Sequence, residues 1–280
     1  MQIKWNAIRV CVGLLFILQL FCVAVATCRA DDKNIQGEEV QVGNSFYLMA
    51  RIQNCIDATI TVTGTLDNMS STVKFPFTVE TTGQSRILLA VVTPVDSTKE
   101  WGYTWNADWK YGHRLSAAPA ESYIYSLPYR GGQRLVVQGA NGTFSHYAGS
   151  QNEQALDFAM PIGTPVYPAR PGVVVAIRTD CTVGGPDVRL KKDGNYLVIR
   201  HSDGTYAEYL HLETDGVLVH LGDQVTTNQP VALSGNTGFT STPHLHFEVF
   251  YTIDGITRKS LPVVFHGSAG TILVQQGSYY

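Results

Sequence analysis

Apolar and polar residues alternate with a period of two along most of the chain, in segments of strand length. Between residues 38 and 125 these segments are separated by turn-forming glycine, asparagine and proline. The clearest segments are residues 45–50, 58–63 and 85–92. Such alternation places the apolar side chains of a strand on one face, and β-branched residues are abundant here. Residues 31–125 are therefore predicted to form a small antiparallel β-sandwich.

The second half of the chain shows the same alternation, and no stretch in either half has a convincing helical period. Its clearest segments are residues 172–177, 196–201 and 206–212. Residues 126–132 contain a proline and two glycines, which indicates a linker or an entry turn. We therefore predict an all-β chain, with the sandwich followed by an antiparallel β-sheet domain over residues 126–280.

Residues 1–30 predict a secretory signal peptide. Lys4 and Arg9 precede an apolar run over residues 10–26, and small residues then lead into two aspartates. Two alternatives stay open, because the run is only just long enough to span a membrane as an uncleaved anchor, and Cys28 stands in a loose lipidation box. We expect an exported protein of the periplasm, the cell envelope or the extracellular space. Membrane association is expected only in the two alternative cases.

The charge balance argues against a nucleic-acid partner. The chain has 20 basic and 23 acidic residues, and removing residues 1–30 takes away three basic residues and no acidic one. The predicted mature chain therefore has a net charge of −6 and lacks the excess of basic residues that would attract a nucleic acid. A hydrophobic content of 44% also excludes a disordered tail.

Two further features allow more than one interpretation. Cys55 and Cys181 stay in the mature chain, and the sequence is equally compatible with a disulfide and with two separate buried thiols. Four aromatic residues crowd into one short segment: Trp101, Tyr103, Trp105 and Trp109. They suit a platform for sugar rings, but we favour a place in the sandwich core, because aromatic side chains dominate cores by buried area.

The segment His244-Leu245-His246 is the first chemical signal. In a strand, both imidazoles project from one face while Leu245 turns to the core. Two such imidazoles can both approach a zinc ion, or one can bind while the other handles protons. Glu248 shares this face, where it either orients the histidines or is a solvated charge just past a groove.

A hydrolytic zinc site needs three protein ligands and an open position. Upstream candidates are His146, Asp157 and His211. A carboxylate complements two neutral imidazoles as a ligand set. Each candidate alone is a weak signal, because most single histidines are satisfied surface or core residues. Their combined order along the chain, with the turns around them, strengthens the metal hypothesis.

Taken together, the motifs between residues 144 and 251 resemble the lysostaphin-type zinc metallopeptidases, which cut peptide cross-links in bacterial peptidoglycan. The matching segments are residues 155–166, 171–174, 194–201, 209–212, 221–225, 234–238 and 243–249. The resemblance implies a zinc metallopeptidase domain with a substrate groove over residues 126–280. It does not extend to residues 31–125.

By position, the resemblance implies three zinc ligands: His146, Asp157 and His246. It implies that His211 and His244 are the catalytic histidines that do not bind the metal. The chain departs from the common pattern of the family at one place, because the first histidine usually stands four residues before the aspartate, and Glu153 occupies that position here. Glu153 is therefore an alternative oxygen ligand.

The predicted function is zinc-dependent hydrolysis of the peptide cross-links of peptidoglycan, with its stem peptides as the binding partner. The alternative is a non-catalytic module of the same fold that binds peptidoglycan or activates a separate amidase. The bond that is cut, the role of the N-terminal domain and the oligomeric state are not fixed by the sequence.

Overall fold

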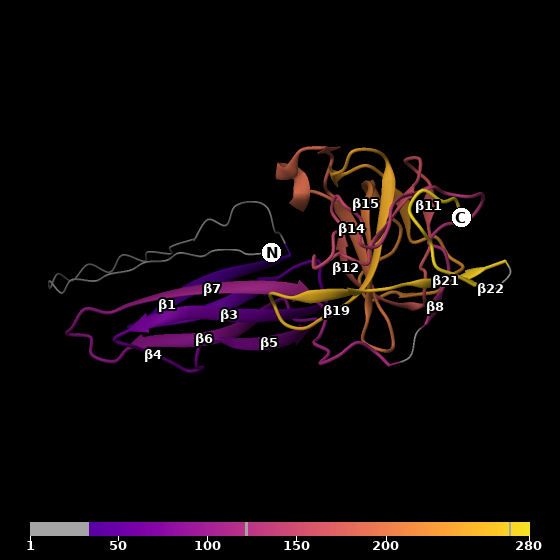
Figure 1. Ribbon diagram of the computed structural model, residues 1–280. Helices are drawn as coiled ribbons and strands as arrows, with labels where there is room; N and C mark the ends of the chain where they lie inside the picture. Colours follow the sequence, from indigo (N-terminus) through magenta and orange to yellow (C-terminus); the bar gives the residue numbers. More distant parts are fainter. Residues whose placement is uncertain (1–33, 121–122, 269) are drawn as a thin grey trace. The chain divides into compact units, whose positions relative to one another are not determined.

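The computed structural model describes residues 34–120, 123–268 and 270–280 (Figure 1). The predicted signal peptide lies outside the described residues. The chain divides into two compact units. Among the described residues, the first comprises residues 34–53, 58–110 and 254–256, and the second comprises residues 54–57, 111–253 and 257–280. The division into domains at residue 125 stays a prediction.

The all-β prediction is confirmed. Within the described ranges, the one regular helix is the short 3₁₀ element η1 (Val188–Lys192), and all other regular elements are strands. No helix in that part of the chain is long and apolar enough to cross a membrane.

The first unit contains two sheets that pack as a sandwich. One is antiparallel, with the order β1-β2-β6-β4: β1 (Ile35–Val42), β2 (Ser45–Ile52), β6 (Arg86–Pro94) and β4 (Met69–Ser71). The other has the order β5-β3-β7: β5 (Phe77–Thr82), β3 (Asp57–Asp67) and β7 (Gly102–Tyr111). The ring of Phe46 on β2 lies 5.2 Å from that of Tyr103 on β7, which joins the two sheets face to face.

The aromatic cluster of this unit belongs mainly to the core. Tyr103, Trp105 and Trp109 alternate along β7, and each is less than 5% exposed. Trp101 packs its ring against Phe46. Burial on this scale supports the interpretation as core and leaves little aromatic surface for a sugar platform.

The second unit is organised around one large sheet with the order β16-β12-β14-β15-β19-β10-β9. These strands are β16 (Gln224–Val225), β12 (Gly172–Arg178), β14 (Asn195–Arg200), β15 (Tyr206–Val217), β19 (His244–Thr252), β10 (Leu156–Ala159) and β9 (Val136–Gln138). The strands β20 (Arg258–Leu261), β11 (Pro165–Val166) and β17 (Ala232–Ser234) join it at its sides. Neighbouring strands of the main sheet are antiparallel, as predicted.

Smaller sheets complete the second unit. The strands β13 (Gly184–Gly185) and β18 (Gly238–Phe239) form a parallel pair. A three-stranded sheet consists of β8 (Ile124–Tyr125), β21 (Val264–Gly267) and β22 (Gly270–Ile272).

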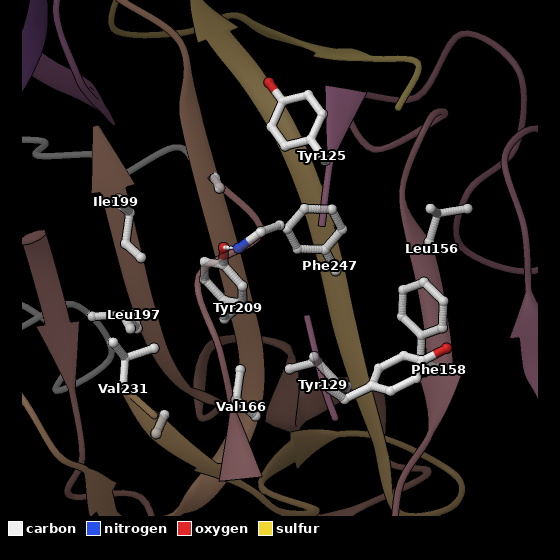
Figure 2. Packing of buried hydrophobic residues seen from close by; sticks show 14 of the residues in the cluster. Tyr125, Tyr129, Leu156, Phe158, Val166, Leu197, Ile199, Tyr209, Val231 and Phe247 are labelled. Carbon is white, nitrogen blue, oxygen red and sulfur yellow. Dashed lines mark hydrogen bonds between the residues drawn. The ribbon is translucent and has the colours of Figure 1, made fainter. Parts of the chain in front are cut away.

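One face of the main sheet carries the hydrophobic core (Figure 2). Phe158 of β10, Tyr209 of β15 and Phe247 of β19 are all fully buried there. The hydroxyl of Tyr209 accepts a hydrogen bond of 2.8 Å from the backbone N–H of Ala169, so its polar end is satisfied. Burying each such ring contributes about 2–3 kcal/mol, which anchors the central strands.

Cys55 and Cys181 do not form a disulfide with each other, and both side chains are buried. Of the two possibilities that the sequence left open, the structure therefore supports separate buried thiols.

Candidate metal centre

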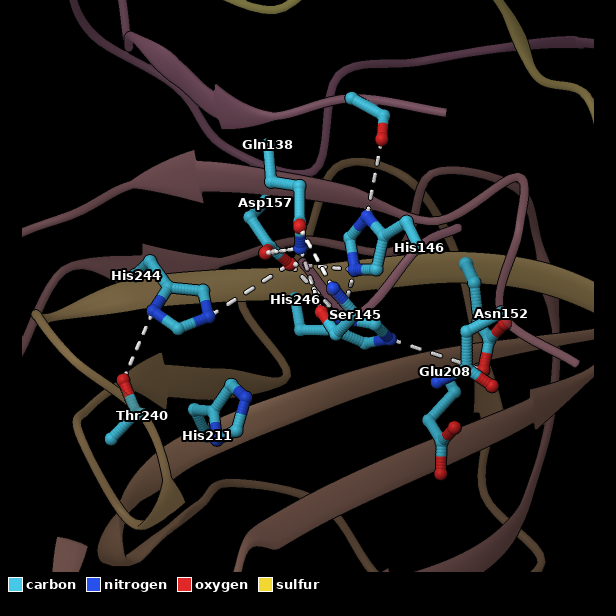
Figure 3. A network of polar contacts seen from close by, with 12 residues as sticks. Gln138, Ser145, His146, Asn152, Asp157, Glu208, His211, Thr240, His244 and His246 are labelled. Atoms are coloured by element: carbon cyan, nitrogen blue, oxygen red, sulfur yellow. Dashed lines mark hydrogen bonds and ion pairs between the residues drawn. The ribbon is translucent and has the colours of Figure 1, made fainter. Parts of the chain in front are cut away.

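The opposite face of the same strands is polar (Figure 3). Along β19, Leu245 and Phe247 point into the core, so His244 and His246 lie on the other face, as the alternation predicted. The register of β10 against β19 places Asp157 directly across from His246. Backbone pairing between segments 89 residues apart therefore brings the carboxylate to the imidazole.

His146 completes a group of three. It lies in the chain between β9 and β10 and is fully buried. Its Nε2 is 3.3 Å from His246 Nδ1 and 3.5 Å from Asp157 Oδ1. The third distance, from His246 Nδ1 to Asp157 Oδ1, is 3.0 Å. One nitrogen from each histidine and one carboxylate oxygen thus converge on a single point.

This arrangement suits a divalent cation. Tetrahedral ligands at about 2.0–2.1 Å from a zinc ion lie about 3.3–3.4 Å from one another, close to the three distances observed. Two imidazoles and one carboxylate are also a ligand set that hydrolytic zinc sites use. Among the residues that the structure describes, these three form the group able to hold a metal ion.

The outer atoms of the group are held by the protein. Gln138 Nε2 donates to Asp157 Oδ2 at 3.0 Å and to Ser145 Oγ at 2.7 Å, while Ser145 N–H donates to Gln138 Oε1 at 3.0 Å. His146 Nδ1 lies 3.3 Å from the carbonyl oxygen of Gly139. These contacts turn Asp157 Oδ1 and His146 Nε2 toward the point of convergence, and Gln138 joins Asp157 to Ser145, the residue before His146.

His211 reaches the polar face through a β-bulge. In β15, Tyr196 pairs with Leu210 and Asn195 with Leu212, so His211 is the extra residue, and its φ of 65° is left-handed. In a regular strand His211 would share the core face of Tyr209, but the bulge shifts the alternation. Leu212 takes the core position instead, and His211 turns toward His244, with ring centroids 4.6 Å apart.

Backbone carbonyls fix the orientation of both remaining histidines. His211 Nδ1 lies 2.7 Å from the oxygen of Thr237, and His244 Nδ1 lies 2.7 Å from the oxygen of Thr242. Because a carbonyl only accepts, the Nδ1 of each ring carries a proton. His244 Nε2 is 3.8 Å from Asp157 Oδ1, and the Thr240 hydroxyl supports the ring at 3.1 Å from Nδ1.

Residues 151–258 match the model of peptidase family M23. The chain carries a peptidase family M23 domain. The resemblance found in the motifs is thereby confirmed. Asp157, His211, His244 and His246 fall within the matched residues, whereas His146 lies five residues before them.

The M23 domain is similar to parts of several bacterial proteins. An uncharacterized metalloprotease of Buchnera aphidicola is 29% identical over 180 residues, which cover 64% of this chain and 44% of that protein. The peptidoglycan DD-endopeptidase ShyA of Vibrio cholerae is 45% identical over 93 residues, covering 33% and 19%. Lysostaphin of Staphylococcus simulans is 34% identical over 116 residues, covering 41% and 21%. The chain spans less than half the length of each.

Burial sets the protonation of the polar face of the M23 domain. Burial and the neighbouring His244 and His246 lower the pKa of His211 to about 3, so this ring is neutral at physiological pH. Burial alone would raise the pKa of Asp157, but its hydrogen bond to His246 and the neighbouring charges of His246, His244 and His146 together lower it. Burial would likewise lower the pKa of His246, but Asp157 and Glu248 together raise it to about 10. In the metal-free chain a proton therefore competes with a cation for His246 at neutral pH and below.

Behind His246 lies an ion triad. Arg258 Nη2 contacts Glu248 Oε1 and lies 2.9 Å from Glu208 Oε2. The side chain of Glu248 is fully buried, so the alternative of a solvated charge past a groove is wrong. Glu248 Oε1 is 3.9 Å from His246 Nε2, on the side of the ring away from the ligand group.

The structure does not bring Glu153 into the ligand group. Its Oε2 accepts a hydrogen bond of 2.7 Å from the backbone N–H of Gly149, and its carbonyl oxygen accepts one of 2.6 Å from Asn141 N–H. Glu153 therefore shapes the loop that carries His146. The roles of the five site residues predicted from the sequence remain predictions, although four of them converge in space and His211 stands beside His244.

Four residues around the M23 site have no counterpart in the sequence-based expectations: Gln138, Glu208, Thr240 and Arg258. Two of them are close in sequence to predicted site residues: Glu208 lies three residues before His211, and Thr240 lies four before His244. The others depend on strand register, which no local pattern in the sequence reveals.

Proposed function

We propose that the M23 domain, over residues 126–280, is a zinc-dependent endopeptidase that hydrolyses the peptide cross-links of bacterial peptidoglycan. The convergence of His146 Nε2, Asp157 Oδ1 and His246 Nδ1, all within 3.5 Å of one another, is the observation that carries this proposal. These three residues would hold a zinc ion, which would supply Lewis acidity and make water a stronger nucleophile near neutral pH.

The catalytic work of the chain falls to His211 and His244. The Nδ1 proton of each ring is engaged by a backbone carbonyl, so Nε2 is the ring atom left to exchange a proton. One of them accepts a proton as the nucleophile forms, and a proton is then returned to the departing amine. A neutral imidazole suits this role, and the lowered pKa of His211 keeps that ring neutral.

The names of the relatives support the choice of substrate. ShyA is named as a peptidoglycan DD-endopeptidase, and the family match covers Asp157 and three of the site histidines. We propose the same polymer as substrate here, with its stem peptides as the bound part. Since peptidoglycan lies outside the cytoplasm, the proposal includes export directed by residues 1–30, to the periplasm, cell envelope or extracellular space.

Mass analysis of reaction products tests this proposal. The zinc-loaded full chain is incubated with purified peptidoglycan and with defined cross-linked muropeptides. We expect cross-linked dimers to be converted into monomers, and we expect the nearly isosteric variant Asp157→Asn to release none. Wall binding without any product from the zinc-loaded chain would contradict the proposal and would favour the non-catalytic module.

A further inference from the structure

The ion triad behind His246 is almost completely buried. The side chains of Arg258, Glu208 and Glu248 are 13%, 9% and 0% exposed. Glu208 on β15 pairs directly with Glu248 on β19, so two carboxylates lie side by side on neighbouring strands. Like charges in that arrangement would repel each other; burial and the neighbouring Glu248 raise the pKa of Glu208, and the single guanidinium of Arg258 bridges the two carboxyl groups from β20.

Stability does not explain this triad. Replacing a buried ion group by apolar residues of similar volume is often neutral or stabilising, because removing charges from water is costly. The neighbouring core face of the same strands is filled with apolar side chains, so the fold accommodates them readily. A buried group with two acids and one base therefore points to a role in the adjacent site.

The place of Glu248 relative to the His246 ring indicates that role. Glu248 Oε1 faces Nε2 at 3.9 Å, while Nδ1 faces Asp157 and His146. Among the described residues, none makes a hydrogen bond to His246 Nε2. A nearby negative carboxylate favours the tautomer with its proton on Nε2, which leaves the Nδ1 lone pair for a metal.

Arg258 is held rigidly enough to fix the two carboxylates. Its guanidinium carbon lies 4.5 Å from the ring centroid of Phe250, and that ring stacks on Tyr206 at 5.7 Å. Asn152 Oδ1 lies 3.4 Å from the same Nη2 that meets both carboxylates. A planar guanidinium that stacks on an aromatic ring and shares one nitrogen between two acids has little freedom to turn.

We propose that Arg258 is a positioning residue that holds Glu208 and Glu248 together, so that the Glu248 carboxylate selects the metal-binding tautomer of His246. The triad thereby sets the affinity of the site for its metal. The inference rests on the proposed function in one respect, because it takes His246 Nδ1 as a zinc ligand.

Zinc affinity tests the inference without reference to turnover. The full chain is stripped of metal, and zinc affinity is measured by competition with a chromophoric chelator, with the visible spectrum of the Co²⁺ form as a second readout. Glu248→Gln and Arg258→Gln are each expected to weaken zinc binding by about 10–100-fold and to change the Co²⁺ spectrum. Glu208→Gln, which leaves the contact between Arg258 and Glu248 intact, is expected to cause a smaller loss.

Two variants of β20 give matched controls. Lys259→Gln removes the exposed cation next to Arg258 and should leave zinc affinity unchanged. Arg258→Lys should recover only part of the loss, because the flexible lysine side chain has no planar group to stack on the ring of Phe250 and hold the nitrogen between the two carboxyl groups. Thermal unfolding of the metal-free variants checks the fold, and Glu248→Gln carries the test alone if Arg258→Gln does not fold.

The outcomes separate the two proposals. If the wild-type chain binds zinc and folded Glu248→Gln binds it within threefold of Lys259→Gln, the role of the triad is contradicted while the proposed function stands. If Glu208→Gln weakens binding as much as Glu248→Gln, the specific role of Glu248 is also contradicted. A wild-type chain that binds no zinc overturns the proposed function itself.

Discussion

The two faces of strand β19 are both buried, and they are chemically opposite. All nine residues of β19 are buried, yet Leu245, Phe247 and Val249 build the core, whereas His244 and His246 belong to the metal centre. Burial alone therefore does not distinguish a core from a site in this protein. The distinction is which groups are buried and how their polar atoms are satisfied.

The polar face persists because its groups find partners on other strands. Burying an unpaired polar group costs several kcal/mol of folding free energy. Here the Asp157 carboxylate accepts hydrogen bonds from Gln138 and His246, and His211 is hydrogen-bonded to a backbone carbonyl. The apolar face requires only side chains of suitable volume and shape. The polar face requires the correct register of several strands at once, because its hydrogen-bond partners come from different strands. The following predictions use that contrast.

Loss of a ligand is expected to have the largest effect. Asp157→Ala or His246→Ala should remove the bound zinc equivalent and reduce hydrolysis of purified peptidoglycan by more than the 10²–10⁴-fold typical of one acid–base group. Metal analysis after dialysis, together with a turnover assay, checks this. Zinc retained at one equivalent by Asp157→Ala would contradict the ligand assignment.

Loss of a non-ligand histidine should separate chemistry from metal binding. His211→Ala or His244→Ala is expected to keep the metal and to lower kcat by about 10²–10⁴-fold, because each removes a general acid–base group. His220→Ala, which changes a side chain that is 92% exposed, is the control and should leave kcat unaltered. Near wild-type kcat in both site variants would exclude the proposed proton transfer.

A change on the apolar face should affect stability and leave the metal in place. Leu197→Ala, at a fully buried core position of β14, is expected to cost about 2–5 kcal/mol of unfolding free energy. The folded fraction should still bind one zinc. Chemical denaturation of the metal-free protein measures the cost. Loss of zinc without loss of stability would mean that the two faces are not independent.

The smallest expected effect concerns a buried histidine outside the metal centre. Burial lowers the pKa of His201 to about 4, below the 6.5 of an ordinary histidine. The unfolded chain therefore binds this proton more readily than the folded chain, and unfolding free energy rises with pH between about 4 and 6.5. The contribution, up to about 3 kcal/mol, is fully present above pH 6.5 and is lost as the pH falls through 4.

Denaturation curves of His201→Gln and the wild-type chain at pH 4.5, 5.5 and 7 check this prediction. The slope of unfolding free energy against pH should be shallower in the variant. Equal slopes would show that His201 already titrates normally in the folded protein.

Local periodicity allowed much of this fold to be predicted. The period of two in residues such as Leu245, His246 and Phe247 predicted both the strand and the face on which each side chain lies, because successive side chains of a strand point to opposite faces. The all-β class follows from the same pattern. The group around His146 was anticipated from the order of several motifs and from family resemblance.

The remaining features depend on contacts between distant segments. The bulge at His211 reverses the alternation of core-facing and polar-facing side chains within β15. The left-handed residue is His211 itself, and no glycine next to it in the sequence predicts that conformation. Arg258 follows an irregular turn, and only its pairing beside β19 brings it to Glu208 and Glu248. Cross-strand register of this kind is set by the whole sheet and is not encoded in any local segment.

Anomalous diffraction at the zinc edge, from crystals of the zinc-loaded full chain, tests the central claim most directly. The account predicts one strong peak about 2.0–2.2 Å from His146 Nε2, Asp157 Oδ1 and His246 Nδ1, with His211 and His244 outside bonding distance. A chain that binds one zinc in solution but shows its peak at any other set of residues would contradict the account.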